Sequence, residues 1–185
     1  MVLYINACVR YDSRTAELAS YLIDKIGKPF TEVRLHEIDF PVVDEAFINR
    51  RNEMVWNKDF DDPLCFLARQ FAEADTIIIA APFWDLSFPA ALKQYFEQIN
   101  VLGVTFVYNE EGFPQGLCKA DKIYYVTTAG GPIYSDSFGF GYVKALAQSF
   151  YQIPEAICIK AEKLDIIGAD VNAILAEAKR TIDEL

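Results

Sequence analysis

The segment Cys8–Thr15 combines two arginines with hydroxyl-bearing side chains at the predicted start of a helix. Backbone N–H groups at a helix N-terminus point toward a bound anion. Ser13 and Thr15 add hydroxyl groups to this turn. Arg10 and Arg14 add positive charge, which suits a phosphate. These residue types at this position predict a phosphate-binding turn.

Two further segments favour a flat ligand. Pro82–Pro89 carries Phe83 and Trp84 directly after an apolar run. A surface loop with two large rings is unfavourable unless something flat covers them, and a planar cofactor would do so. Thr127–Pro132 contains paired glycines, which let a backbone approach a ligand closely and leave N–H groups free to donate.

Each of these segments also has a plain structural interpretation. Asp12 or Ser13 would only cap the following helix, which is the more common role for such residues. Phe83 and Trp84 would only close the edge of a sheet. The glycine pair in Thr127–Pro132 would only form a flexible turn. The ligand hypothesis gains weight if the fold brings the three segments together.

Strands and helices alternate along the chain. Short apolar runs predict five strands, and apolar stripes at helical spacing predict the helices between them. The predicted strands are Val2–Ala7, Phe30–Leu35, Asp75–Ala80, Lys122–Thr128 and Ala156–Lys160. The predicted helices are Ser13–Ile26, one starting at Asp61–Pro63, one opened by Ser87 and Pro89, one through Val143–Phe150 and one through Val171–Ile182. His36–Phe60 shows no clear period and is predicted to be irregular.

Five strands alternating with helices indicate a parallel sheet with right-handed crossovers. We predict an α/β fold with a doubly wound five-stranded parallel sheet in the order 2-1-3-4-5 and helices on both faces. Ligands bind such sheets beyond the carboxyl ends of the strands, so the three segments should meet at one edge. Val101–Ala120 interrupts the pattern. Gly103–Tyr108 alternates like a strand and Asn109–Gly112 turns the chain, which predicts a small hairpin that packs on a partner subunit.

Composition limits the classes of function. The chain has 185 residues, of which 52% are hydrophobic, enough for one domain spanning residues 1–185. A formal net charge of −10 argues against a nucleic-acid partner. We find no membrane-spanning run and no signal peptide. The four cysteines lie far apart, which predicts reduced thiols, no metal site and a cytoplasmic protein.

Three motifs follow one another at a characteristic spacing. They are Ala81–Leu86 with Leu92-Lys93 after it, Gly103–Tyr108, and Val126–Gly131. Together they resemble the FMN-dependent NADH-azoreductase and NAD(P)H:quinone oxidoreductase family. The resemblance covers nearly the whole chain and is strongest over residues 76–131.

The resemblance implies a flavodoxin-like fold and a homodimer with one FMN per subunit at the interface. It implies that NADH or NADPH gives a hydride to FMN, which then reduces a quinone or azo compound in a ping-pong sequence. The flavin carries this chemistry, so no catalytic side chain is expected. The implied FMN contacts are Cys8, Ser13, Arg14 and Thr15 at the phosphate; Phe83, Trp84, Asp85 and Leu86 along the ring and ribityl chain; and Thr128, Ala129, Gly130 and Gly131 at the pyrimidine end, while Phe106 of the hairpin lies near the flavin on the substrate side. From the residues themselves we add Arg10, whose charge suits the phosphate, and Pro82, which opens the second segment.

The chain departs from the family pattern at four of these positions. Cys8 and Thr15 stand where the family usually has serine, and a thiol is the weaker hydrogen-bond donor. Arg10 is positioned to compensate for Cys8. Asp85 stands where asparagine is common, and Ala129 stands where arginine is frequent.

Two other functions stay open. A flavodoxin-type electron carrier would bind FMN without a substrate of its own, and an acidic chain suits docking on basic partners. A flavin-free hydrolase or regulator would be colourless. The only histidine, His36, has no neighbours in sequence that would orient it for proton transfer, and no nucleophile motif accompanies it.

Overall fold

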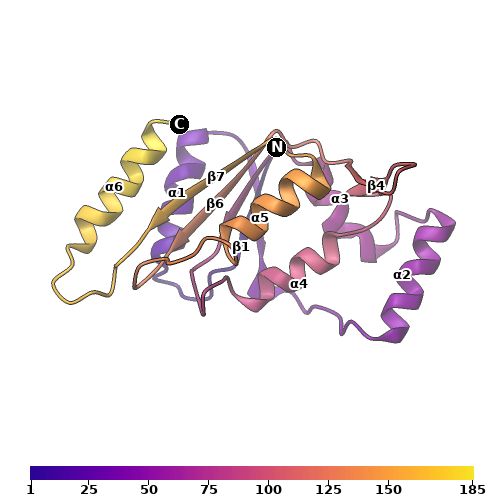
Figure 1. Cartoon of the computed structure of the whole chain (residues 1–185), viewed down its shortest axis with the longest axis horizontal. Helices are drawn as coiled ribbons and strands as arrows, with labels where there is room; N and C mark the ends of the chain where they lie inside the picture. The colour runs from indigo at the N-terminus through magenta and orange to yellow at the C-terminus, as the bar shows by residue number, and fades with distance from the viewer.

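Five parallel strands form the sheet at the centre of the molecule (Figure 1). The computed structural model describes residues 1–185. The strands are β1 (Val2–Asn6), β2 (Phe30–Arg34), β3 (Thr76–Ala80), β6 (Lys122–Thr128) and β7 (Glu155–Ala161). Their spatial order is β2-β1-β3-β6-β7. Counted within this sheet alone, that is the predicted order 2-1-3-4-5, so the predicted fold class is confirmed.

Helices cover both faces of the sheet (Figure 1). α1 (Arg14–Ile26) and α6 (Val171–Asp183) lie on one face, and α3 (Phe66–Glu73), α4 (Ala90–Ile99) and α5 (Phe140–Leu146) lie on the other. Alternate residues of β1 serve the two faces: Tyr4 packs in the cluster beneath α1 and α6, whereas Leu3 and Ile5 pack beneath the other three. No helix is both long and apolar enough to cross a membrane.

The segment predicted to be irregular contains a regular helix, α2 (Glu45–Asn57). Asp44 caps it by accepting a hydrogen bond from the Phe47 N–H at 2.8 Å. Only Met54 of this helix is buried, and a helix that packs so little of its surface on the core needs no wide apolar stripe in its sequence. The prediction for His36–Phe60 was therefore wrong because a helix with so little buried surface leaves a weak pattern. Short helical turns also occur at Leu35–Glu37, Pro63–Cys65 and Ala147–Tyr151.

The predicted hairpin is present as β4 (Phe106–Tyr108) and β5 (Pro114–Gly116), which pair antiparallel. The Asn109 side chain accepts hydrogen bonds from the N–H groups of Glu111 and Phe113 and closes the turn. Phe106 is only 7% exposed and packs on Phe150, with ring centroids 5.0 Å apart. Phe106 is therefore covered by its own chain, whereas Tyr108, which is 53% exposed, lies at the surface of the hairpin.

Candidate functional site

A cavity of about 300 Å³ lies beyond the carboxyl ends of β1, β3 and β6. The three turns predicted to converge form its walls. The predicted residues that line it are Cys8, Arg10, Ser13, Arg14, Thr15, Pro82, Phe83, Trp84, Thr128, Ala129 and Gly130. Asp85, Leu86, Gly131 and Phe106 are not among the lining residues. The sheet topology therefore unites most of the candidate residues in one site.

The first turn serves both the helix and the cavity. The Ser13 hydroxyl caps α1 by accepting from the Ala16 N–H at 3.3 Å. The backbone N–H groups of Arg14 and Thr15, the first two residues of α1, donate to no acceptor in the protein. The Thr15 and Thr128 hydroxyls lie 2.6 Å apart and join the first turn to the third. Capping and anion binding are thus compatible here, because the cap uses a different N–H group.

Cys8 forms part of the wall at the base of this turn. It is 5% exposed, and its thiol lies 3.8 Å from the Ala80 carbonyl oxygen. Burial raises the pKa of the thiol, so Cys8 is a neutral and weak donor. Arg10 lies at the surface, with Nε 3.4 Å from a carboxylate oxygen of Asp12. Arg10 can contact a phosphate in the cavity only if its side chain breaks the ion pair with Asp12.

The second turn is strained. Trp84 and Ser87 exchange two backbone hydrogen bonds of 2.9 and 2.8 Å around Asp85 and Leu86. Both central residues are left-handed, with φ of 49° and 69°. This is the geometry of a type I′ turn, which normally takes asparagine and glycine. The turn places Trp84 on the cavity and leaves Leu86 at the surface. Non-glycine residues held this way are found where a fold must clamp a ligand.

We expect Leu86→Gly to raise the free energy of unfolding by about 1 kcal/mol, because glycine adopts a positive φ without steric conflict. The free energy is measured by urea denaturation of the cofactor-free protein. Ala90→Gly is the matched control: Ala90 begins α4, where glycine gains nothing and lowers helix stability. Equal effects of the two substitutions would contradict the strain assigned to the turn.

The third turn, Thr128–Gly131, is held by the loop between β7 and α6. The N–H groups of Lys163, Leu164 and Asp165 donate to the carbonyls of Gly131, Ala129 and Gly130 at 3.1, 3.1 and 2.9 Å, respectively. A Cβ atom on Gly130 would overlap the Asp165 carboxylate. The N–H groups of Gly130 and Gly131 donate to no protein acceptor, so they remain available to a ligand.

Sequence reasoning missed Leu164 and Asp165, which also line the cavity. Arg14 donates to the Asp165 carboxylate at 2.9 Å across 151 positions of sequence. A local sequence pattern cannot predict an ion pair between residues so far apart in the chain. The ion pair neutralises Arg14, so the backbone N–H groups of α1 are the stronger attraction for an anion.

The family model Flavodoxin_2, described as a flavodoxin-like fold, matches residues 1–185. The chain belongs to this family. The FMN-dependent NADH:quinone oxidoreductase of Coprothermobacter proteolyticus is 33% identical over 196 residues, covering 100% of this chain and 96% of the relative. The enzyme of that name from Lachnoclostridium phytofermentans is 36% identical over 188 residues, covering 96% and 93%.

A solved structure shares the fold of this chain. The FMN-dependent NADH-azoreductase of Bacillus anthracis, crystallised in complex with FMN, superposes with a TM-score of 0.83. The match covers 99% of this chain and 95% of the azoreductase at 20% sequence identity. At that identity the similarity establishes the fold of this member of the family and not its substrate.

Proposed function

We propose that this chain is an FMN-dependent oxidoreductase that takes a hydride from NADH or NADPH and reduces quinones and azo compounds by a two-electron, ping-pong mechanism. The observation that carries the proposal is one cavity with unpaired backbone donors at two ends. The family and the names of the full-length relatives support it.

The residues present fit FMN. The free N–H groups of Arg14 and Thr15 suit a terminal phosphate, and the Thr15 hydroxyl lies beside them. Trp84 and Phe83 line the cavity and suit the flat ring system. The free N–H group of Gly130 suits a carbonyl oxygen at the pyrimidine end. In this proposal Asp85, Leu86 and Gly131 flank the ring without forming the cavity wall.

The flavin, when bound, accepts and passes on the hydride. The chain's own residues bind and orient it. The free backbone N–H groups of Gly130 and Gly131 would stabilise negative charge at the pyrimidine end of FMN, because they are already in place and need no reorganisation. Phe83 and Trp84, which line the cavity, would exclude water from the ring. The proposal requires no side chain as nucleophile or base, because the flavin supplies the hydride chemistry.

We further propose that the active form is a homodimer. α2 projects at one end of the molecule beside the β4–β5 hairpin (Figure 1). Trp56 of α2 is 87% exposed, and Tyr108 of the hairpin is exposed too. Val55, Leu102 and Tyr108 line a shallow groove between these elements. A two-fold contact through this surface would bury it with one patch on each subunit.

The decisive test starts with purified protein. We expect a yellow protein whose visible spectrum is that of a flavin, and whose heat-released cofactor co-elutes with FMN on chromatography. FAD is not expected, because the first turn lacks the glycine fingerprint that holds a pyrophosphate. NADH oxidation should accelerate when a quinone is added. A colourless protein that takes up no FMN on reconstitution would refute the proposal.

A flavodoxin-type electron carrier is the second candidate, favoured by the net charge of −10. The same experiment separates the two functions. A carrier would contain FMN and yet would oxidise NADH no faster with quinone present. It would also run as a monomer with an exposed flavin edge.

The Thr15–Thr128 contact gives a prediction about cofactor affinity. Thr15→Val keeps the shape of the side chain but removes the hydroxyl that joins the first and third turns. We expect FMN to bind about tenfold more weakly, the equivalent of one hydrogen bond. Affinity is measured by quenching of FMN fluorescence. Thr31→Val on the edge strand β2, far from the cavity wall, is the matched control and should leave affinity unchanged.

A further inference from the structure

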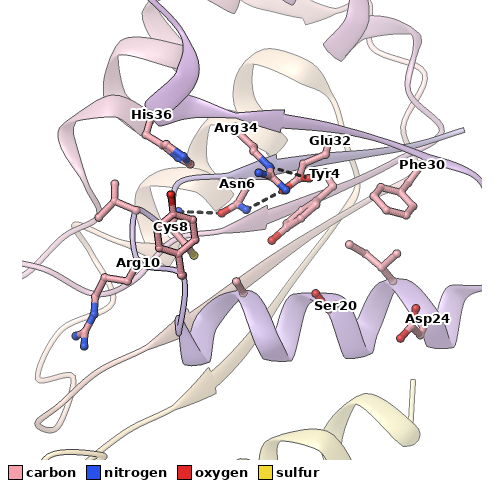
Figure 2. A pocket seen from close by; sticks show the side chains of 14 residues that line it. Tyr4, Asn6, Cys8, Arg10, Ser20, Asp24, Phe30, Glu32, Arg34 and His36 are labelled. Carbon is pink, nitrogen blue, oxygen red and sulfur yellow. Dashed lines mark hydrogen bonds and ion pairs between the residues drawn. The ribbon is translucent and has the colours of Figure 1, made fainter.

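A second cavity of about 330 Å³ lies on the other side of the first turn. α1 forms one wall, β1 and β2 form the floor, and the loop after β1 closes one end (Figure 2). Cys8, Val9 and Arg10 border both cavities. The remaining lining residues play no part in the proposed flavin site.

The floor of this second cavity contains an unsatisfied hydroxyl group. Tyr4 is 4% exposed, and its hydroxyl has no hydrogen-bond partner. Burial is the main reason that the pKa of Tyr4 is raised, so the hydroxyl stays neutral and can donate or accept. Buried polar groups are nearly always paired in native proteins. Because Tyr4 lines the cavity, a ligand that reaches this hydroxyl would supply the missing partner.

A fixed carboxylate lies beside Tyr4 (Figure 2). Glu32 accepts from the Asn6 amide at 2.8 Å and lies 3.0 Å from Nε of Arg34. The Asn6 side-chain oxygen in turn accepts a hydrogen bond from the Cys8 N–H at 2.9 Å, which fixes the orientation of the Asn6 amide. Each Glu32 oxygen keeps further acceptor capacity, because a carboxylate offers about four lone-pair sites. Glu32 and Tyr4 together can receive two neighbouring hydroxyl groups.

The rest of the cavity is apolar along one side and carries charged or polar side chains at its two ends. Phe30 and Ile23 provide apolar surface. Arg10 and His36 supply donors at the end near the loop, while Asp24 of α1 supplies an acceptor at the other end. Along its length the cavity therefore presents hydrogen-bond donors that suit an anion, then the acceptors Glu32 and Tyr4 that suit a diol, and an apolar wall.

We propose that this cavity binds a ribonucleoside 5′-phosphate, with the ribose hydroxyls on Glu32 and Tyr4. The base packs on Phe30 and Ile23, and the phosphate lies near Arg10 and His36. Glu32 lies in the middle of β2, in register with Tyr4 of β1, so the two side chains come from adjacent strands of the cavity floor. The volume is that of a small-ligand site.

The nucleotide has two possible sources, which share this chemistry. One is a free nucleotide such as AMP. The other is the adenylyl half of the NADH donor, and this version rests on the function proposed above. Competition between AMP and NADH in the quinone assay distinguishes them: a raised KM for NADH assigns the site to the donor, and an unchanged KM assigns it to a free nucleotide.

The test is equilibrium dialysis of labelled AMP against both the FMN-loaded and the cofactor-free protein. We expect saturable binding to one site per chain, with 2′-deoxy-AMP bound about tenfold more weakly because one hydroxyl contact is missing. AMP binding is measured without flavin and without turnover. The protein can therefore bind AMP even if it proves not to be an oxidoreductase, and it can be an oxidoreductase without binding AMP. Absence of saturable AMP binding at millimolar concentration, or equal affinity for the deoxynucleotide, would overturn the proposal.

Tyr4→Phe is the matched substitution. It removes a hydroxyl that makes no contact in the protein, so the free energy of unfolding should not fall while AMP affinity drops about tenfold. Tyr95→Phe is its control, since the Tyr95 hydroxyl is also buried and unpartnered but belongs to the cluster on the opposite face. Glu32→Gln tests the same site independently, and Glu184→Gln at the end of α6, outside the cavity, is its control. Unchanged AMP affinity in both Tyr4→Phe and Glu32→Gln would also overturn the assignment.

Discussion

Gly130→Val should weaken FMN binding about 100-fold, since forcing extra methyl groups into a tight site typically costs 1–3 kcal/mol and each tenfold corresponds to 1.4 kcal/mol. A Cβ atom at residue 130 overlaps the Asp165 carboxylate. The Asp165 side chain must turn away to relieve this overlap, which disturbs its ion pair with Arg14 on the cavity wall. The valine side chain also lies on that wall beside the free Gly130 N–H and hinders close approach of a ligand to the backbone. FMN affinity is measured by fluorescence quenching, with circular dichroism to confirm that the protein is folded.

Two control variants isolate the cause. Gly131→Ala should leave the free energy of unfolding unchanged, because a Cβ atom there meets nothing within 4 Å. The double variant Gly130→Ala/Asp165→Ala should bind FMN more tightly than Gly130→Ala alone, because the overlapping carboxylate is gone. Wild-type FMN affinity in Gly130→Val would show that the third turn does not contact the cofactor.

Most of the sheet could be predicted from the sequence because its central strands are buried on both faces. Residues 77–80 of β3 are completely inaccessible, and they read as an unbroken apolar run. Alternation of such runs with amphipathic helices leaves few topologies, and the order 2-1-3-4-5 is among the common ones. The convergence of the three turns follows from that topology alone.

The errors arose where tertiary contacts outweigh local pattern. α2 buries only Met54, so the Asp44 cap was the one local signal that could have identified it. The Arg14–Asp165 ion pair joins the start of the chain to its last loop, and nothing local in the sequence encodes it. Phe106 has the alternation of a surface strand, yet Phe150 covers it from a helix more than forty positions later.

The second large effect concerns assembly. Light scattering should give the wild-type protein twice the 21.0 kDa mass of one chain. We expect Trp56→Glu to shift the mass to that of one chain and to weaken self-association about 100-fold or more, because burying an unpaired charge at an interface costs several kcal/mol. Trp56 is 87% exposed in the single chain, so the substitution leaves its core intact.

Ile167→Glu provides the matched control for this substitution. Ile167 is fully exposed in the loop before α6, which lies at the opposite end of the molecule from α2 (Figure 1). The Ile167→Glu variant should remain dimeric and active in quinone reduction. Quinone reduction by Trp56→Glu should fall and then recover as protein concentration is raised, because mass action repopulates the dimer. A wild-type mass of 21.0 kDa with full FMN content and activity would contradict the dimer, since each chain would then complete its site alone.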